Sequence, residues 1–431
     1  MKTRALFTSN ALVLFLLLFA RGAGAQERDA PKVEVGVQYS SLSVNLPVFG
    51  GTENAVGFGG RVTYNFNNYF AVEAEGNLFP SDLSRRFTTG GASQQLQAGL
   101  KAGKRWKRFG LFAKARPGLV SFGETLNPHL VTSGGVTSLD PLRERKTHFS
   151  MDVGGVLEFY PTRRTLVRFD AGDTIIRYGA HDEFAPFIFG TPPALARVGP
   201  EVRHNFQFTA GVGFRFGGGG DEGAASQQSS AAGERVRRFE VGMQFSSLVL
   251  RLPADGFGFG DEGSGAEAGG GLRFGVNATN YLAFEVEGNF YPRRRFGIDT
   301  AVGGYPSQAQ AGVKYGRRFE HFGVFGKARP GVVHFSSVSE VSGYDSVVFG
   351  GQTFFFPNFR DTSKTYFSMD LGGVFEFYPS KRILTRFDVG DTMIRYPERD
   401  NPSTFTNTPP PRLPAELRHN LQVTAGIGFR F

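Results

Sequence analysis

The sequence predicts an all-β fold of antiparallel strands joined up and down into transmembrane β-barrels, and three observations support it. Most segments alternate apolar and polar residues with the period of two that a strand requires. Glycine (59 residues) and phenylalanine (46 residues) are abundant, which suits kinked, aromatic-rich strands better than helices. Whole segments also recur in the same order about 200 residues later, so the pattern occurs twice.

The first 25 residues are expected to be a secretory signal peptide. Lys2 and Arg4 precede an apolar run over 11–20, and Ala23-Gly24-Ala25 then offers a cleavage site. A membrane-spanning helix needs about 20 residues, so a retained anchor is the less favoured alternative. Loss of this segment lowers the formal charge from +9 to +6, which does not indicate a nucleic-acid partner. The chain has no cysteine, which excludes disulfides and cysteine-based metal sites.

A domain-sized duplication organises the rest of the chain. The segment FSMDVGGVLEFYP at 149–161 returns as FSMDLGGVFEFYP at 367–379, and RFDAGDTIIRY at 168–178 returns as RFDVGDTMIRY at 386–396. Between the copies lies GGGGDEGAASQQSSAAGER, whose composition is that of a flexible linker. The predicted organisation is a signal peptide at 1–25, a first barrel repeat at 26–216, a linker at 217–235 and a second barrel repeat at 236–431.

The first copy is expected to contain eight strands, and the second copy repeats them. In chain order the expected strands are 33–46, 55–66, 69–79, 94–106, 109–123, 147–160, 165–178 and 203–216. Tight turns follow the second, fourth and sixth strands, whereas the other connections are long and rich in glycine, proline, serine and charge. Short turns on one side and long loops on the other are typical of an outer-membrane barrel, whose short turns face the periplasm.

Alternation separates a charge-free apolar face from a polar face. In the sixth strand, Phe149, Met151 and Val153 lie opposite Ser150 and Asp152. A charge that faces lipid costs about 2–4 kcal/mol at the bilayer midplane, so the charge-free faces fit lipid contact. Aromatic residues flank the short turns, as an interfacial girdle requires. They are Tyr64, Phe66, Tyr69, Trp106, Phe109, Phe159 and Tyr160.

The last strand, which ends Gly428-Phe429-Arg430-Phe431, resembles the closing strand of the small outer-membrane β-barrel family, the OmpA transmembrane-domain and OmpX-like porin family. The resemblance covers nearly all of the chain after the signal peptide, twice, although the first copy departs from the pattern by continuing beyond Phe216. It implies location in the bacterial outer membrane, with the short turns and the C-terminus in the periplasm. The implied partners are outer-membrane lipid, lipopolysaccharide and the outer-membrane assembly machinery, which would recognise Phe429 and Phe431. No cofactor and no nucleic acid are implied.

Charged residues gather on the faces expected to point into the barrels. Enclosed charges must pair, because an unpaired buried charge costs several kcal/mol. The nearly balanced set therefore predicts an interior salt-bridge network, with an ion-conducting path as the alternative. The residues are Glu34, Arg61, Glu73, Glu75, Lys101, Lys114, Arg116, Asp152, Glu158, Arg168 and Asp170 in the first copy, and Glu240, Arg273, Glu285, Glu287, Lys314, Lys327, Arg329, Asp370, Glu376, Arg386 and Asp388 in the second.

Other candidate sites have less support in the sequence. Asp170 and Asp173 offer two acids where a hard-metal site needs six or more oxygen donors, and Asp173 is expected at a bulge or near the outer rim. His204 and His419 correspond between the copies, but neither has an evident recurring catalytic partner. Basic clusters in the long loops are expected to face lipopolysaccharide phosphates or solvent. They are Arg85-Arg86, Arg143-x-Arg145-Lys146 and Arg293–Arg295.

Sixteen strands permit two eight-stranded barrels in tandem or one sixteen-stranded barrel. The linker, with a reach of about 24 Å, and the balanced charges within each copy favour two barrels. The predicted function is non-enzymatic, a structural or surface-interaction role through loops 124–146, 179–202, 336–364 and 397–417. A single sixteen-stranded porin that conducts small solutes is the alternative, and an outer-membrane hydrolase is the third class.

Overall fold

The structure is a computed structural model of the chain. It describes residues 31–46, 51–84, 86–133, 136–184, 195–217, 237–253, 264–294, 301–402 and 411–431. These residues form two compact units, one drawn mainly from each half of the chain. The predicted signal peptide lies outside the described residues, as does the predicted linker apart from Gly217. Among the described residues, no helix is long and apolar enough to cross a membrane.

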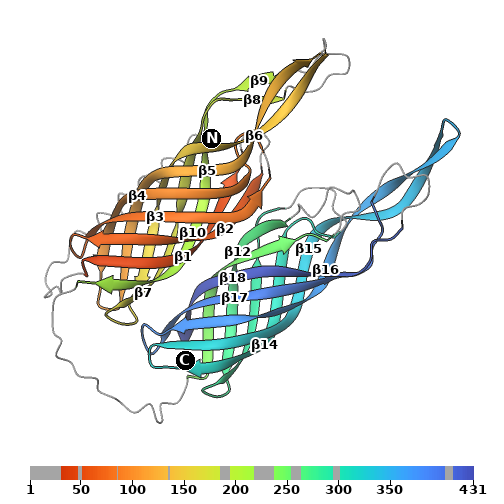
Figure 1. Cartoon of the computed structure of the whole chain (residues 1–431). Coiled ribbons are helices and arrows are strands. Elements are labelled where there is room, and N and C mark those ends of the chain that lie inside the picture. Colours follow the sequence, from red (N-terminus) through yellow and green to blue (C-terminus); the bar gives the residue numbers. More distant parts are fainter. Residues whose placement is uncertain are drawn as a thin grey trace, which may run out of the picture. The chain divides into compact units, whose positions relative to one another are not determined.

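The first unit is a closed, eight-stranded antiparallel barrel (Figure 1). Its strands are β1 (Val33–Asn45), β2 (Thr52–Asn65), β3 (Phe70–Leu83), β4 (Gly91–Arg105), β5 (Phe109–Ser133), β6 (Val136–Phe159), β7 (Thr165–Tyr178) and β10 (Glu201–Phe216). Their order is β1-β10-β7-β6-β5-β4-β3-β2, and the pairing of β2 with β1 closes the ring. A separate two-stranded sheet, β8 (His181–Phe184) with β9 (Leu195–Val198), lies in the connection between β7 and β10.

The second unit has the same architecture. Its strands are β11 (Phe239–Arg251), β12 (Ser264–Asn277), β13 (Leu282–Phe290), β14 (Pro306–Arg318), β15 (Phe322–Phe349), β16 (Gln352–Phe377), β17 (Ile383–Tyr396) and β18 (Glu416–Arg430). They follow the order β12-β11-β18-β17-β16-β15-β14-β13, and β13 pairs with β12 to close the ring. The predicted all-β class of antiparallel barrels is therefore confirmed. We call the end of each barrel with the short connections its turn end, and the other its loop end.

Each barrel buries its charged side chains and exposes its apolar ones. Arg116 and Arg168 are at most 1% exposed, whereas Val37 is 66% and Leu272 is 68% exposed. A soluble β-protein has the opposite distribution, because its apolar faces pack against each other. An apolar outer wall around a polar interior is the arrangement of a barrel surrounded by lipid.

The structure differs from expectation in two long connections. In place of a loop over 124–146, β5 and β6 remain paired as a hairpin, and in place of a loop over 336–364, β15 and β16 do the same. Figure 1 shows both hairpins running beyond the neighbouring strands. A register shift follows Phe122 in one hairpin and Phe335 in the other, where barrel pairing gives way to the free hairpin. Backbone pairing between the two arms of each hairpin extends the strands, although neither arm shows a clear alternation of apolar and polar residues.

The other two predicted loops are described only in part. Strands β8 and β9 occupy part of loop 179–202, and an isolated bridge joins Arg399 to Leu413 in loop 397–417. Residues 185–194 and 403–410 lie outside the described residues.

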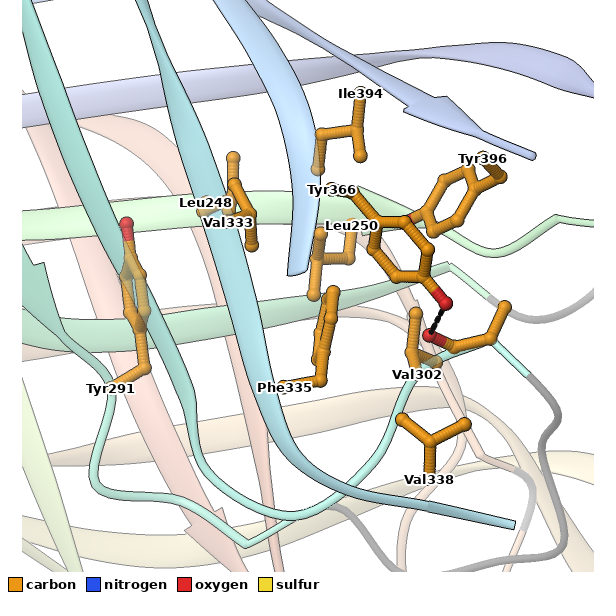
Figure 2. Close-up of a cluster of buried hydrophobic side chains, with 11 residues drawn as sticks. Leu248, Leu250, Tyr291, Val302, Val333, Phe335, Val338, Tyr366, Ile394 and Tyr396 are labelled. Carbon is orange, nitrogen blue, oxygen red and sulfur yellow. Dashed lines mark hydrogen bonds between the residues drawn. The ribbon is translucent and has the colours of Figure 1, made fainter. Parts of the chain in front are cut away.

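A cluster of buried apolar side chains fills the loop end of the second barrel (Figure 2). Side chains from β11, β15, β16 and β17 meet Val302, which lies in the connection between β13 and β14. The hydroxyl of Tyr366 donates a hydrogen bond of 2.8 Å to the carbonyl oxygen of Ala301. The connection is therefore held inside the barrel by apolar packing and by one directed hydrogen bond. The cluster is Leu248, Leu250, Tyr291, Ala301, Val302, Val333, Phe335, Val338, Tyr366, Ile394 and Tyr396.

Candidate functional site

The inward-facing charges of the first barrel meet in the middle of its interior. Arg116 on β5 donates from Nε and Nη2 to Asp152 of β6, at 3.0 and 2.5 Å, and from Nη1 to Glu75 of β3 at 2.5 Å. Lys114, two residues earlier on β5, lies 2.8 Å from the same Asp152 carboxylate. Alternation places all four side chains on inward faces, and the closed ring brings β3 opposite β5 and β6.

A second group lies beside the first and surrounds Arg168 of β7. Its guanidinium donates to Asp170 at 2.6 and 2.8 Å, and to Glu73 of β3 at 2.9 Å. Lys101 of β4 donates to Glu158 of β6 at 2.6 Å. Each acid and base in this group has a partner of opposite charge, which offsets the cost of removing the charges from water.

The second barrel repeats both groups at the corresponding positions. Arg329 donates to Asp370 at 3.0 and 2.6 Å and to Glu287 at 2.5 Å. Arg386 donates to Glu285 at 2.9 Å and to Asp388 at 2.7 Å. The same network is therefore built twice by two segments of sequence that differ in many outward-facing residues.

The structure places all twenty-two residues predicted for the interior networks, eleven in each barrel, on the inside, and each is at most 5% exposed. Sequence reasoning missed members at the turn end. Arg105 lies 3.0 Å from Glu34, and the guanidinium of Arg215 lies 4.2 Å from the ring centre of Tyr160. Arg105 lies four residues after the inward-facing Lys101, so alternation alone could have identified it.

The interior acids do not form a vacant metal site among the described residues. Glu240, Glu285 and Glu376 bring carboxylate oxygens within 4.8 Å of one another. The ammonium of Lys314 lies 3.5 Å from Glu240 and 3.0 Å from Glu285, and it also contacts Glu376. A side-chain cation therefore already occupies the position that a metal ion would take.

The two aspartates of the segment at 168–178 also lie apart. Asp170 is buried in the interior, whereas Asp173 is partly exposed on the outer wall. Of the two alternatives expected for Asp173, a bulge or a position near the outer rim, the bulge is wrong, because β7 keeps an unbroken register through this residue with both neighbouring strands. The two carboxylates face opposite sides of the wall and cannot share one ion.

The outer wall carries a histidine–aspartate pair in each barrel, which sequence reasoning missed. Nδ1 of His204 lies 2.5 Å from Asp173, and Nδ1 of His419 lies 2.5 Å from Asp391. The sequence offered no evident recurring partner for these histidines, and the structure supplies an aspartate for each. The partners are 31 and 28 residues away in sequence and meet only through the register of β7 with β10 and of β17 with β18.

This pair lacks the third member of a hydrolytic site. The groove around His204 contains no hydroxyl or thiol side chain among its described lining residues, so no nucleophile lies beside the pair there. The lining residues are Asn45, Ala171, Gly172, Asp173, His204 and Phe206.

The structure describes only some residues of the predicted basic clusters in the long loops. Arg143 lies 3.8 Å from Glu124 with both side chains exposed, and Arg145 donates to Ser121 at 3.3 Å. Arg293 lies 4.0 Å from Glu267, while Arg85 and Arg295 lie outside the described residues. The predicted assembly residues Phe429 and Phe431 are 51% and 65% exposed at the end of the chain.

One family model matches the first half of the chain. The model described as outer membrane protein beta-barrel domain matches residues 11–216. The N-terminal β-barrel domain of Pseudomonas aeruginosa OprF is 13% identical over 43% of this chain and 99% of its own, with a TM-score of 0.24. Neisserial surface protein A (NspA) is 18% identical over 43% and 99%, with a TM-score of 0.25.

Ail, the attachment invasion locus protein of Yersinia pestis, was solved in complex with the heparin analogue sucrose octasulfate. It is 14% identical over 44% of this chain and 100% of its own, with a TM-score of 0.26. TM-scores this low carry no argument about function. No curated protein matches the chain.

Proposed function

Since residues 11–216 match the model of the outer membrane protein β-barrel domain family, we propose that this chain is a non-enzymatic, non-conducting protein of the bacterial outer membrane that presents its long hairpins for surface interactions. Residues 1–25 export the chain, and the short turns and the C-terminus lie in the periplasm. Phe429 and Phe431 serve as the signal for the assembly machinery. Lipid and lipopolysaccharide surround the apolar walls.

The filled interior is the observation that supports this function best. The residues grouped around Arg116 and Arg168 occupy the middle of the first barrel and are at most 4% exposed, and those around Arg329 and Arg386 in the second barrel are at most 5% exposed. An eight-stranded barrel is just wide enough for its own side chains to fill it. Displacing one partner of such a buried pair costs about 3–5 kcal/mol, so ions have no low-energy path through either network.

The hairpins support a role in interaction. The arms of β15 and β16 remain paired as far as Phe349 and Gln352, which makes an ordered projection rather than a plain loop. Val347 is 52% and Val348 is 69% exposed near the tip of this hairpin, and Leu130 is 46% exposed in the β5–β6 hairpin. Exposed apolar residues on a projecting element often mark contact surfaces.

Conductance measurements test this proposal against a single sixteen-stranded porin that conducts small solutes. The folded full chain, verified by a heat-dependent shift in gel mobility, is added to planar lipid bilayers. We expect no stable conductance steps. Reproducible steps in the nanosiemens range, absent from a heat-unfolded sample of the same preparation, would favour the porin and contradict a filled interior.

A further inference from the structure

A hollow on the first barrel collects positive charge where the wall meets the loop end. We define the β6–β7 hollow as the cavity of about 630 Å³ lined by Arg145, Lys146 and Arg177, with Phe149 and His148 beside them. We infer that it binds the phosphate group of a phosphorylated lipid of the outer leaflet. This inference rests on the proposed outer-membrane location and adds a ligand and a site to it.

The charge of the hollow is not neutralised by its own lining. No aspartate or glutamate is among the described residues that line it. The side chain of Arg177 makes no hydrogen bond or ion pair with the described residues, and it is exposed. Among the described residues, Arg145 is bound only to the Ser121 hydroxyl at 3.3 Å. Lys146 donates to the carbonyl oxygen of Phe87 at 3.3 Å and lies 3.6 Å from Glu144, which is outside the lining. Two guanidinium groups therefore remain available to an anion, and the partly paired ammonium of Lys146 adds positive charge beside them.

Guanidinium and ammonium groups in this arrangement suit a phosphate. Arginine presents parallel N–H donors to two oxygens of one phosphate, and lysine adds a point charge. A hollow of this volume lies within the usual range for ligand sites and exceeds the size of one phosphate. The remaining space would take the group to which the phosphate is attached, such as a sugar.

The position of the hollow points to a lipid rather than to a soluble anion. Phe149 borders it and is 51% exposed on the apolar outer face of β6. Met151 and Val153 continue this face toward the turn end, where the wall is expected to contact acyl chains. A ligand with an anionic head in the hollow and an apolar tail along β6 would satisfy both surfaces at once.

The second barrel provides an internal comparison. The shared FSMD segment aligns Arg145 with Ser363 and Lys146 with Lys364, so one cation is missing there. The remaining lysine, Lys364, is already paired with Glu340. Only Arg395, the counterpart of Arg177, stays exposed without a described hydrogen bond or ion pair. We therefore expect phosphate binding at the first barrel and not at the corresponding place on the second.

The test measures binding of diphosphorylated lipid A to the full chain in detergent by native mass spectrometry. Arg145→Ser together with Arg177→Gln should weaken binding roughly tenfold or more, since each substitution removes charge-assisted hydrogen bonds to the phosphate. Arg395→Gln, the matched change in the second barrel, should leave binding unchanged. Lipid A with both phosphates removed should bind all variants equally weakly, and millimolar inorganic phosphate should not compete.

Three results would overturn the inference. The first is equal binding of lipid A by the wild type and the double variant. The second is equally strong binding of the phosphorylated and the dephosphorylated lipid by the wild type. The third is full competition by inorganic phosphate, which would indicate a soluble anion as the ligand. Each sample is also checked for recovery from the outer-membrane fraction and for heat-dependent gel mobility. A wild-type chain that does not reach the outer membrane contradicts the proposed function. A chain that reaches it but binds lipid equally with and without the two arginines contradicts only the hollow.

Discussion

Gly154 of β6 lies directly opposite Gly172 of β7, and a Cβ added to Gly154 would be only 2.5 Å from the Cα of Gly172 and 2.3 Å from the carbonyl oxygen of Ala171. The next residue, Gly155, faces outward, and a Cβ there would meet nothing within 4 Å. The two adjacent glycines therefore differ completely in their tolerance of a side chain. Gly372 and Gly373 repeat the same contrast in the second barrel.

Gly154→Ala should destabilise the first barrel, and Gly155→Ala should not. The inward methyl group must displace the backbone of β7, and overpacking of this kind costs about 1–3 kcal/mol. The outward methyl group should change the unfolding free energy by less than about 0.5 kcal/mol. Trp106 is the only tryptophan of the chain, so its fluorescence in urea titrations reports on this barrel. Equal unfolding midpoints for the two variants would show that the backbone of β7 shifts to accommodate the methyl group at no cost in unfolding free energy.

Arg168→Ala should be among the most damaging single changes to the first barrel. It leaves the Glu73 and Asp170 carboxylates without their bidentate partner in the interior, and removing one member of a buried ion pair costs about 3–5 kcal/mol. Arg164→Ala, in the exposed turn before β7, is the matched control and should have little effect. The measurement is again the urea midpoint of Trp106 fluorescence. Similar midpoints for both variants would mean that water enters the interior and solvates the freed acids.

Tyr366→Phe should loosen the connection that enters the second barrel without disturbing the apolar cluster. The change keeps the ring and removes the hydroxyl that donates to the carbonyl oxygen of Ala301, a loss of about 1 kcal/mol. We expect faster trypsin cleavage after Arg294 in the folded protein. Tyr315→Phe, on the exposed wall, is the control and should cleave at the wild-type rate. An unchanged rate for Tyr366→Phe would mean that packing alone holds the connection.

The β15–β16 hairpin should lose stability in acid through Glu340. Hydrogen bonds from Lys364 and Arg360 hold the pKa of this carboxyl below its ordinary value of 4.5. The pair therefore stabilises the hairpin fully above about pH 4.5, and this contribution is lost as the pH falls through the lower folded pKa. Amide protection factors over 336–364 should decrease in that window. The Glu340→Gln variant should lack this decrease, whereas the control Glu320→Gln, in a turn, should retain it. A decrease that persists in Glu340→Gln would show that another group causes the loss of protection.

The interior network was predictable because alternation is a local property of each strand. Asp152 and Val153 reveal opposite faces from their positions alone, and charges enclosed by a closed ring have no alternative to pairing. The hairpin of β5 and β6 beyond Phe122 was not predictable, because its strands form through pairing between two arms that each carry a proline, Pro128 and Pro141, and alternate poorly.

The His204–Asp173 pair shows a second limit. The residues belong to β7 and β10, which are joined by a long connection that does not determine their register. A register shift of one residue would place the two side chains on opposite faces. Only the paired strands reveal that the histidine and the aspartate are neighbours, and only the repeat in the second barrel indicates that the contact is systematic.

The absence of cysteine makes the proposed orientation directly testable. Ser346→Cys lies on the exposed far part of the β15–β16 hairpin, and Asn280→Cys lies in the exposed short turn between β12 and β13. Because the short turns are proposed to face the periplasm, a membrane-impermeant maleimide should label Ser346→Cys on intact cells and label Asn280→Cys only after the outer membrane is opened. Wild-type protein, without a thiol, is the blank. Labelling of Asn280→Cys on intact cells, with Ser346→Cys protected, would reverse the orientation and place the hairpins in the periplasm, where they could not act at the cell surface.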